Sequence, residues 1–451
     1  MNRNHFIGLI LGFAVCMAIS SCGTAPAAEI PPTSPASPTG IPPITSPAPA
    51  TEEPAATLPF EETPLASPLP SATLFAEEPQ PSAAPQLAAG TNLSLDSIHM
   101  VTDTTGWAIS GPYILTTVDG GNTWKEASPP ESLPANSLAQ AYGAFPDEQT
   151  AWVVYGFDQS GATDAAYAMF QIAPTASVWS THDGGRTWTP SPALDHQAIG
   201  DWTWAEFSTL DASTGWMMVR GVYLGAGTHY NAQFFRTIDG GLTWQPIAGG
   251  DIGVDYTGLT FSDENNGWLT WQSTGAYAAA PPDYAVTGDG GDNWEQGEPT
   301  PPTDAPDLFT QYDYCEPYQP KLISAESIKM IVSCYDYYTP PHEYVGYLYS
   351  SADGGRSWTP LPLPKKVVGN NSTMIYFDEM NFLLLGREMY SSDDGGATWN
   401  FIKTVNWDGQ FSFVDNQTGW AIATNENHEK ALVHTVNGGK SWSQIEPVIA
   451  P

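Results

Sequence analysis

The sequence has few basic residues for its length. Its 451 residues include 49 acids but only 14 lysines and arginines, which gives a formal charge of −35 at pH 7. Binding to nucleic acid or to an anionic bilayer surface requires clustered lysine and arginine side chains. The composition therefore argues against both kinds of partner. The acid excess either keeps the protein soluble or suits a cationic partner.

The sequence offers no convincing membrane-spanning helix, which needs about 20 apolar residues. The apolar run over residues 6–19 is shorter, follows Arg3 and precedes the small residues Ser20 and Ser21. Such a pattern is typical of a secretory signal. The tetrad over residues 19–22, Ile-Ser-Ser-Cys, resembles the bacterial lipobox. We expect residues 1–21 to be a lipoprotein signal peptide and Cys22 to carry the lipid, with ordinary cleavage beside an incidental Cys22 as the alternative.

Cysteines are scarce, and the four present separate into three groups. Cys16 lies in the expected signal peptide and Cys22 at the expected lipidation site, which leaves Cys315 and Cys334. In an oxidising compartment, two remaining cysteines are expected to pair. A disulfide across such a gap would stabilise the fold by about 3 kcal/mol. Two buried free thiols are the alternative.

Familiar catalytic and metal-binding motifs are also missing. The eight histidines show no ligand spacing, and the chain has no Gly-x-Ser-x-Gly motif, no Cys/His pair and no phosphate loop. The sequence therefore predicts no catalytic residue, no cofactor and no transition-metal site. A calcium ion among clustered acids stays open.

The stretch that follows the signal has almost no aliphatic periodicity. Residues 22–93 are mainly Pro, Ala, Ser, Thr and Glu. A segment of this composition cannot bury enough apolar surface to offset its ordering entropy. We expect it to be a disordered tether, with the folded domain over residues 94–451.

An octapeptide of the form [ST]-x-[DN]-G-G-x-[STN]-W dominates that domain. It occurs seven times, at intervals of 41 to 64 residues. The acid or amide can accept hydrogen bonds from the following backbone, and Gly-Gly supplies the positive φ of a tight turn between two strands. The acids or amides at its third position are Asp119, Asp183, Asp239, Asp289, Asp353, Asp394 and Asn437.

A second strand-turn-strand element precedes most copies of the octapeptide. It runs from an acid to Gly-Trp, as in residues 103–107 and 415–420, and is degenerate over residues 378–382. Two hairpins per unit make a four-stranded antiparallel blade, and units of this size must stack on copies of themselves. We therefore predict an all-β, seven-bladed propeller. Two separate β domains of three and four units are the alternative.

The repeat resembles a known family. The octapeptide is similar to the Asp-box, or bacterial neuraminidase repeat. Its combination with the acid-to-Gly-Trp element resembles the photosystem II assembly and stability factor family over residues 97–446. That resemblance implies a propeller with a binding or assembly role. The family is expected to use a basic patch, from which this chain departs, so no binding residue transfers by motif.

Strand order places the two kinds of turn on one face of the propeller. The Gly-Trp turns and the Asp-box turns join first to second and third to fourth strands. The other connections, which include the insertions at 158–176, 225–232, 273–282, 335–342 and 299–320, must lie on the opposite face. Because loops on a rigid scaffold often carry function, we expect the binding site on that opposite face. Neutral decoration is the alternative.

Aromatic residues without a role in the repeat mark the expected binding face. Trp202, Trp204 and Trp407 precede inner strands and are expected near the mouth of the channel. Tyrosines cluster around the two cysteines, and a disulfide would bring the two Tyr-Asp-Tyr segments together. Tyr and Trp provide amphipathic contact area suited to a protein or glycan. The tyrosines of this group are Tyr312, Tyr314, Tyr318, Tyr335, Tyr337 and Tyr338. A self-packed insertion is the alternative.

An enzyme of the sialidase or xyloglucanase type is the competing hypothesis. The chain lacks the Arg-Ile-Pro segment of sialidases, and its length allows one propeller rather than the pair that xyloglucanases place around a cleft. Glycosidases need two carboxyl groups about 5 to 9.5 Å apart. Asp201, Asp255 and Asp313 are candidates that the sequence does not rank. We favour a non-catalytic protein- or glycan-binding module, monomeric and lipid-anchored at the cell surface or periplasmic face.

Overall fold

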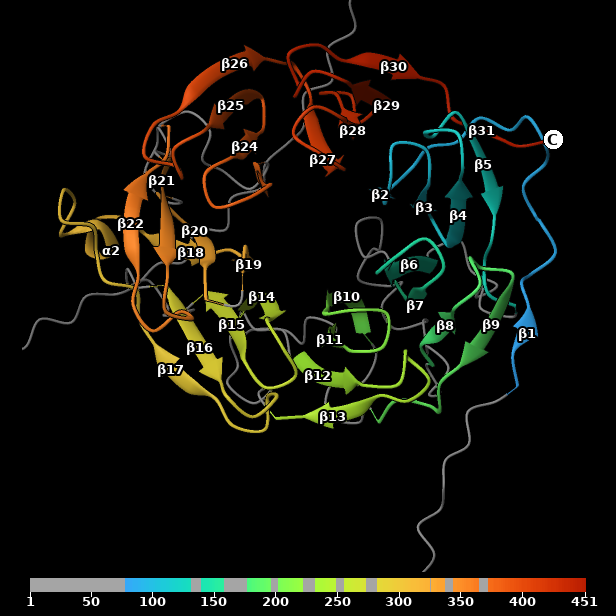
Figure 1. Cartoon of the computed structure of the whole chain (residues 1–451), viewed down its shortest axis with the longest axis horizontal. Helices are drawn as coiled ribbons and strands as arrows, with labels where there is room; N and C mark the ends of the chain where they lie inside the picture. The colour runs from blue at the N-terminus through green and yellow to red at the C-terminus, as the bar shows by residue number, and fades with distance from the viewer. Residues whose placement is uncertain are drawn as a thin grey trace, which may run out of the picture. The chain divides into compact units, whose positions relative to one another are not determined.

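Seven β-sheets form a ring around a central channel (Figure 1). The computed structural model describes residues 78–130, 139–157, 177–195, 202–221, 232–248, 255–272, 282–324, 326–336, 344–364 and 372–451. They belong to one unit that runs from Ala72 to Pro451. Among these residues, α2 (Leu308–Gln311) is short, and no helix is long and apolar enough to cross a bilayer. The predicted seven-bladed, all-β propeller is confirmed.

Each blade is contiguous in sequence, with its first strand beside the channel and its last strand outside (Figure 1). The strands of the first four blades are β2 (Ser97–Met100), β3 (Gly106–Ser110), β4 (Tyr113–Thr117) and β5 (Thr123–Glu126); β6 (Ala139–Ala144), β7 (Ala151–Phe157), β8 (Trp179–Thr181) and β9 (Thr187–Pro190); β10 (Trp202–Thr209), β11 (Gly215–Gly221), β12 (Ala232–Thr237) and β13 (Gln245–Ile247); β14 (Asp255–Phe261), β15 (Gly267–Gln272), β16 (Asp283–Thr287) and β17 (Glu295–Gly297).

The remaining three blades follow the same order. Their strands are β18 (Tyr314–Pro317), β19 (Lys321–Leu322), β20 (Ile328–Tyr335), β21 (Tyr344–Ser351) and β22 (Thr359–Pro362); β23 (Thr373–Tyr376), β24 (Phe382–Leu385), β25 (Glu388–Ser392) and β26 (Asn400–Thr404); β27 (Asp408–Phe413), β28 (Gly419–Thr424), β29 (Lys430–Thr435) and β30 (Ser443–Ile445). Antiparallel pairing joins neighbouring strands in each of these blades.

The two kinds of turn lie side by side on one face of every blade. In the first blade, the Gly120 N–H donates to the Thr104 carbonyl at 2.8 Å, which joins the Asp-box turn to the preceding turn. The same bond recurs in the other six blades, from Gly184, Gly240, Gly290, Gly354, Gly395 and Gly438. The strand ends near residues 157, 221, 272 and 335 therefore lie at the opposite face, as predicted. We call the two faces the Asp-box face and the opposite face.

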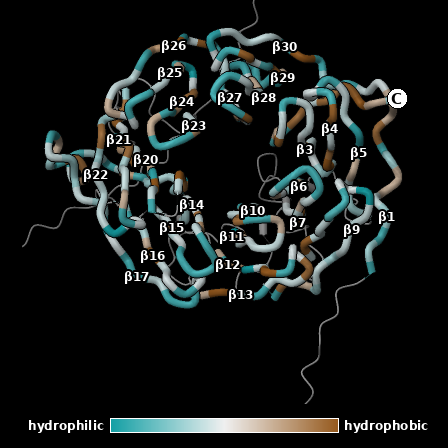
Figure 2. Tube along the Cα trace, in the orientation of Figure 1, coloured by the Kyte–Doolittle hydropathy of each residue, from teal (hydrophilic) through white to brown (hydrophobic). Residues whose placement is uncertain are grey.

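Buried apolar residues fill the spaces between neighbouring blades. Trp152 of the second blade packs with Val219 and Phe235 of the third, and Trp216 of the third packs with Leu259 of the fourth. Figure 2 shows hydrophobic stretches distributed around the ring rather than gathered at one centre. The fold is therefore stabilised at the junctions between blades, where each repeat covers the apolar face of the next.

The fifth blade departs from the expected four-strand pattern at its channel edge. Residues 299–320, predicted to be an interblade loop, contain α2 and β18. Both β18 and β19 pair with β20, so the inner strand is divided into two pieces. Pro320 stands between the pieces, and proline lacks the N–H that a continuous ladder would use. The fifth blade therefore begins inside the segment that was expected to be a connection.

Both ends of the described chain add strands to outer edges, which corrects the predicted tether. The tether was expected to extend to residue 93, but β1 (Gln80–Pro81) pairs with β9 of the second blade. The Gln86 N–H then donates to the Glu126 carboxylate at 2.8 Å. At the other end, β31 (Val448–Ile449) pairs in parallel with β5. Residues 78–93 thus belong to the propeller surface, because their backbone finds partners there.

Candidate binding site

The Asp-box acids are engaged in their own turns. Asp183 Oδ1 accepts hydrogen bonds from Thr181 Oγ1 at 3.0 Å and from the Thr187 N–H at 2.9 Å, while Oδ2 accepts from Thr187 Oγ1 at 2.7 Å. Burial raises the pKa of Asp183, but these bonds outweigh it and lower the pKa overall. Asn437 reproduces the pattern by donating from Nδ2 to Ser441 Oγ at 2.8 Å. The seven residues therefore hold turns together.

Three tyrosine rings form a ladder across the fifth blade at the opposite face. Tyr314, Tyr335 and Tyr344 are cross-strand neighbours on β18, β20 and β21. Ring centroids are 5.6 Å apart between Tyr314 and Tyr335 and 5.4 Å between Tyr335 and Tyr344, with nearly parallel planes. Tyr344 is 42% exposed. The ladder is thus a preformed aromatic surface with an accessible outer ring.

A disulfide lies directly behind this tyrosine ladder. Cys315 and Cys334 are bonded to each other and are paired residues of β18 and β20. They lie one position along each strand from Tyr314 and Tyr335, so the sulfur atoms occupy the other side of the sheet, where both cysteines are buried. The bond holds the first two rungs of the ladder in register.

The other tyrosines of the predicted group have different surroundings. Tyr318 is half-buried. Burial has the largest effect in raising its pKa, and the charges of Glu316 and Tyr335 raise it further. A hydrogen bond with Ser333 opposes that change. Tyr312 packs against the buried cluster that contains Leu308, so its role is mainly structural. Tyr337 and Tyr338 lie outside the described residues.

Trp204 lies at the end of β10 that is nearer the opposite face. The Arg220 guanidinium stands 3.9 Å above its ring, which is a close cation–π contact. Trp202 precedes Trp204 by two residues on β10, and its backbone pairs with Gly221 of β11. Trp407, which was predicted at the channel mouth, instead packs 5.8 Å from Trp442, and it belongs to the cluster between the sixth and seventh blades. Trp407 directly precedes the inner strand β27 and lines a cavity together with Asn425 and Lys430.

The central channel contains a cavity of about 590 Å³ with a mixed polar and apolar wall. Inner strands from five blades contribute to its wall, including residues His99, Gln140, Glu206, Lys321 and Gln410. Burial raises the pKa of Glu206 to about 7, while the charges of Lys321 and Arg220 oppose that rise. Burial also lowers the pKa of Lys321 and of His99. The Lys321 side chain is exposed to the channel, and the surrounding walls exclude much of the water that would otherwise hydrate its charge.

The divided inner strand of the fifth blade brings Lys321 into this cavity. Gln319 Nε2 donates to the Leu259 carbonyl at 2.8 Å, and Thr260 Oγ1 donates to the Pro320 carbonyl at 2.7 Å. A Cβ atom at Gly258 would stand 2.4 Å from Gln319 Cα, so glycine is required for this approach. The segment between β18 and β19 therefore leans against β14.

Sequence reasoning missed Glu206 and Lys321, two charged residues of the channel cavity. Glu206 lies within the aromatic stretch Trp-Thr-Trp-Ala-Glu-Phe of β10. A charged residue in such an inner strand could have identified it as a candidate site residue. Lys321 had no such signal, because its position depends on the tertiary contact with β14. Among the three carboxylates proposed as glycosidase candidates, Asp201 and the side chain of Asp255 lie outside the described residues.

Comparisons with known proteins bear on the fold. No family model and no curated protein matches the chain. Similar solved structures include YCF48 bound to a D1 peptide, at 17% identity and a TM-score of 0.48, covering 82% of this chain and 99% of that one. YCF48 from Cyanidioschyzon merolae has 14% identity and a TM-score of 0.44, covering 78% and 100%.

An enzyme shows the same degree of likeness. The GH74 xyloglucanase from Xanthomonas campestris has 14% identity and a TM-score of 0.42, covering 78% of this chain and 60% of that one. Propellers host unrelated activities, and likeness at these levels does not separate a binding module from a hydrolase.

Proposed function

We propose that the propeller is a non-catalytic binding or assembly module that presents its opposite face to a protein or glycan of the cell envelope. The tyrosine ladder of Tyr314, Tyr335 and Tyr344 carries this proposal. Aromatic rings already held in place lose little conformational entropy on binding, and they offer both apolar area and hydroxyl groups. The ladder stands on a disulfide-linked pair of strands, so it is a rigid surface.

The remaining parts of the proposal concern where the module works. Cys22, acylated after removal of residues 1–21, would anchor the chain at the cell surface or periplasmic face. The segment from residue 22 to about 77 would separate the propeller from the membrane. The net charge of −35 supports contact with the membrane through the lipid only, and a monomeric propeller without nucleic-acid partners.

Capture from the native host tests the binding role. Proximity labelling with the wild-type chain should recover a recurring protein or glycan, and Tyr344→Ala should reduce its recovery by at least several-fold. Phe401→Ala removes an aromatic ring that is 57% exposed on the outer strand β26, and it should leave recovery unchanged. Equal losses in both variants would contradict the assignment of the ladder.

Glycoside hydrolysis is the second candidate, and Glu206 is the observation that favours it. A carboxyl group that lines a cavity and whose pKa burial raises to about 7 resembles the general acid of a glycosidase. We test this with a panel of aryl glycosides and sialosides on wild type and Glu206→Gln. The binding proposal expects no turnover by either protein. Turnover by wild type that is lost in Glu206→Gln would replace the binding proposal with the enzyme.

A further inference from the structure

On the Asp-box face, tryptophan side chains join neighbouring blades by hydrogen bonds, and we call each such bond a latch. The Trp of one blade's Gly-Trp element donates its indole N–H to the carbonyl of the first Asp-box glycine in the next blade. Four junctions share this bond: Trp152 to Gly240 at 2.9 Å, Trp216 to Gly290 at 3.4 Å, Trp268 to Gly354 at 3.2 Å and Trp420 to Gly120 at 2.9 Å. The same indole site is therefore built four times in one molecule.

Two further junctions replace this latch with another contact. Trp107 of the first blade donates to the Asp147 carbonyl of the second blade at 2.9 Å. In the fifth blade Lys329 takes the tryptophan position, and its ammonium lies 3.7 Å from the Glu379 carboxylate of the sixth blade. Ser327 Oγ also donates to that carboxylate at 2.6 Å. Both junctions are thus closed by a polar contact of their own.

The junction between the sixth and seventh blades lacks a latch. Asp378 accepts from the N–H groups of residues 380 and 381, just as Asp415 accepts from those of residues 417 and 418. The second residue of the following strand is Trp420 in the seventh blade but Leu383 in the sixth. The Leu383 side chain has no N–H or O–H group and cannot donate the hydrogen bond that the indole makes. The Gly438 carbonyl, which would receive it, accepts none from the residues that the structure describes.

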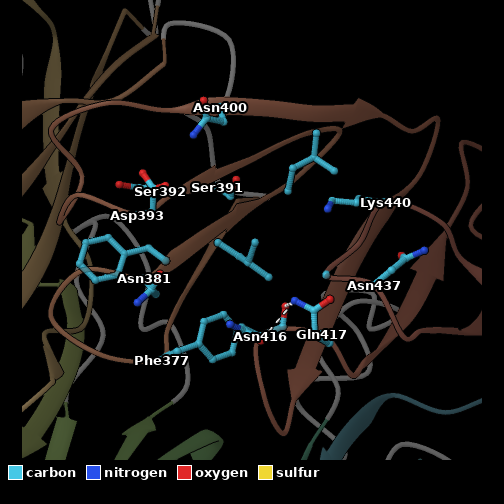
Figure 3. A pocket seen from close by; sticks show the side chains of 14 residues that line it. Phe377, Asn381, Ser391, Ser392, Asp393, Asn400, Asn416, Gln417, Asn437 and Lys440 are labelled. Carbon is cyan, nitrogen blue, oxygen red and sulfur yellow. Dashed lines mark hydrogen bonds between the residues drawn. The ribbon is translucent and has the colours of Figure 1, made fainter.

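A pocket of about 180 Å³ occupies this junction (Figure 3). Leu383 and Gly438, the two ends of the missing latch, both line it. Apolar walls come from Phe377, Phe382 and Ile402. Figure 3 shows polar side chains around them, including Asn400, Asn416, Gln417, Asn437 and Lys440. A cavity of about 150 Å³ admits a benzene ring, so the volume of this pocket is on the scale of an aromatic side chain.

We propose that this pocket binds a tryptophan side chain of a partner protein, whose indole N–H donates to the Gly438 carbonyl. Four sister junctions hold an indole against the equivalent carbonyl, which identifies the occupant by its chemistry. Buried indole groups need an acceptor for their N–H, and tryptophan is a frequent anchor of protein interfaces. The amides at the rim suit the peptide backbone on either side of such an anchor. The pocket lies on the Asp-box face, so it is a second site, distinct from the tyrosine ladder.

Binding of small indole probes to the full chain tests the proposal. In saturation-transfer NMR, N-acetyl-tryptophanamide should bind, and the peptide acetyl-Gly-Trp-Ala-amide should bind more tightly because the rim contacts its backbone. The 1-methyl derivative of N-acetyl-tryptophanamide, which lacks the indole N–H, should bind roughly 2- to 12-fold more weakly. Equal affinity of the methylated and unmethylated probes would contradict the role of Gly438. A peptide that binds no better than the amide would contradict a protein partner.

Two variants locate the probe. Leu383→Trp should fill the pocket with the chain's own indole, raise the melting temperature and abolish probe binding. Ile238→Trp adds a tryptophan at a position that is 64% exposed on the Asp-box face of the third blade, and it should leave binding unchanged. Probe binding that persists in a folded Leu383→Trp protein would overturn the assignment. If that variant does not fold, the comparison of methylated and unmethylated probes decides the question.

Discussion

At the scale of single residues, carboxyl groups of similar chemistry have opposite roles. Asp183 lies in a turn whose N–H and hydroxyl groups stabilise its anion, so its pKa is lowered. Glu206 lies among channel walls that remove water from it, so its pKa is raised. The acids of the repeat are thus fixed by local hydrogen bonds, whereas Glu206 lines the cavity in the channel.

Replacement of an Asp-box acid tests its structural role. Asp183→Ala should lower the free energy of unfolding by about 1–3 kcal/mol, because it leaves the turn N–H groups and hydroxyls without an acceptor. Asp183→Asn should cost less, since Asn437 makes the equivalent contacts in the seventh blade. Chemical denaturation of the two variants measures the difference. Equal costs would show that the charge matters more than the hydrogen-bond pattern.

Glu206 should make stability depend on pH. Its pKa is raised from about 4.5 to about 7 in the folded protein, so the folded state binds more protons between these values. Its contribution to stability is complete below pH 4.5 and is lost as pH rises through 7. The lowered pKa of Asp183 acts in the opposite direction and only at more acidic pH. The melting temperature of wild type relative to Glu206→Gln should therefore fall from pH 5 to pH 8; a constant difference would contradict the assigned pKa.

At the scale of elements, the fifth blade combines the features that support binding. Its inner strand is split, its two cysteines are bonded, and its end at the opposite face carries the tyrosine ladder. The split directs Lys321 toward the channel, while the disulfide keeps β18 paired with β20. One irregular blade therefore contributes both to the tyrosine ladder and to the channel cavity, two of the three regions that we consider for ligand contact.

Loss of the disulfide should weaken this blade. The double variant Cys315→Ser, Cys334→Ser should unfold with about 3 kcal/mol less free energy, because its denatured chain is no longer constrained by the loop. Hydrogen exchange should increase first in β18 and β20. If both strands keep their wild-type protection, β18 is held by its hydrogen bonds and packing alone.

Local sequence patterns predicted the elements, and tertiary contacts decided the exceptions. Each hairpin follows from an acid, two glycines and flanking strand formers, so the turns and their shared face could be derived in advance. The split at Pro320 could not, because it depends on Gly258 accommodating Gln319 from another blade. The same reason explains Trp407, whose packing against Trp442 follows from the path of the chain after β26.

At the scale of the whole molecule, contacts between chain ends close the ring. Gln410 of the seventh blade accepts from the Ile98 N–H at 3.1 Å and donates to the Ile98 carbonyl at 3.2 Å. Outside, β31 pairs with β5, and the Ile449 N–H donates to the Thr91 carbonyl at 2.9 Å. The first and last blades are thus joined at the channel and at the outer edge.

Ile449 should therefore matter for global stability. It is 6% exposed and belongs to the cluster between the last and first blades. Ile449→Ala should reduce the free energy of unfolding by about 2–5 kcal/mol through lost burial and the cavity that remains. Val436→Ala, at a position that is 66% exposed, should change it by less than about 0.5 kcal/mol. Similar values for the two variants, measured by denaturant titration, would mean that β31 does not contribute to closure.

We propose that the partner binds the opposite face of the propeller at the tyrosine ladder. The most direct measurement places the photo-crosslinker p-benzoylphenylalanine at position 344 or at position 238, which are exposed on opposite faces, in full chains expressed in the native host. We predict a recurring adduct from position 344 and none from position 238. A recurring adduct from position 238 with none from position 344 would contradict the account.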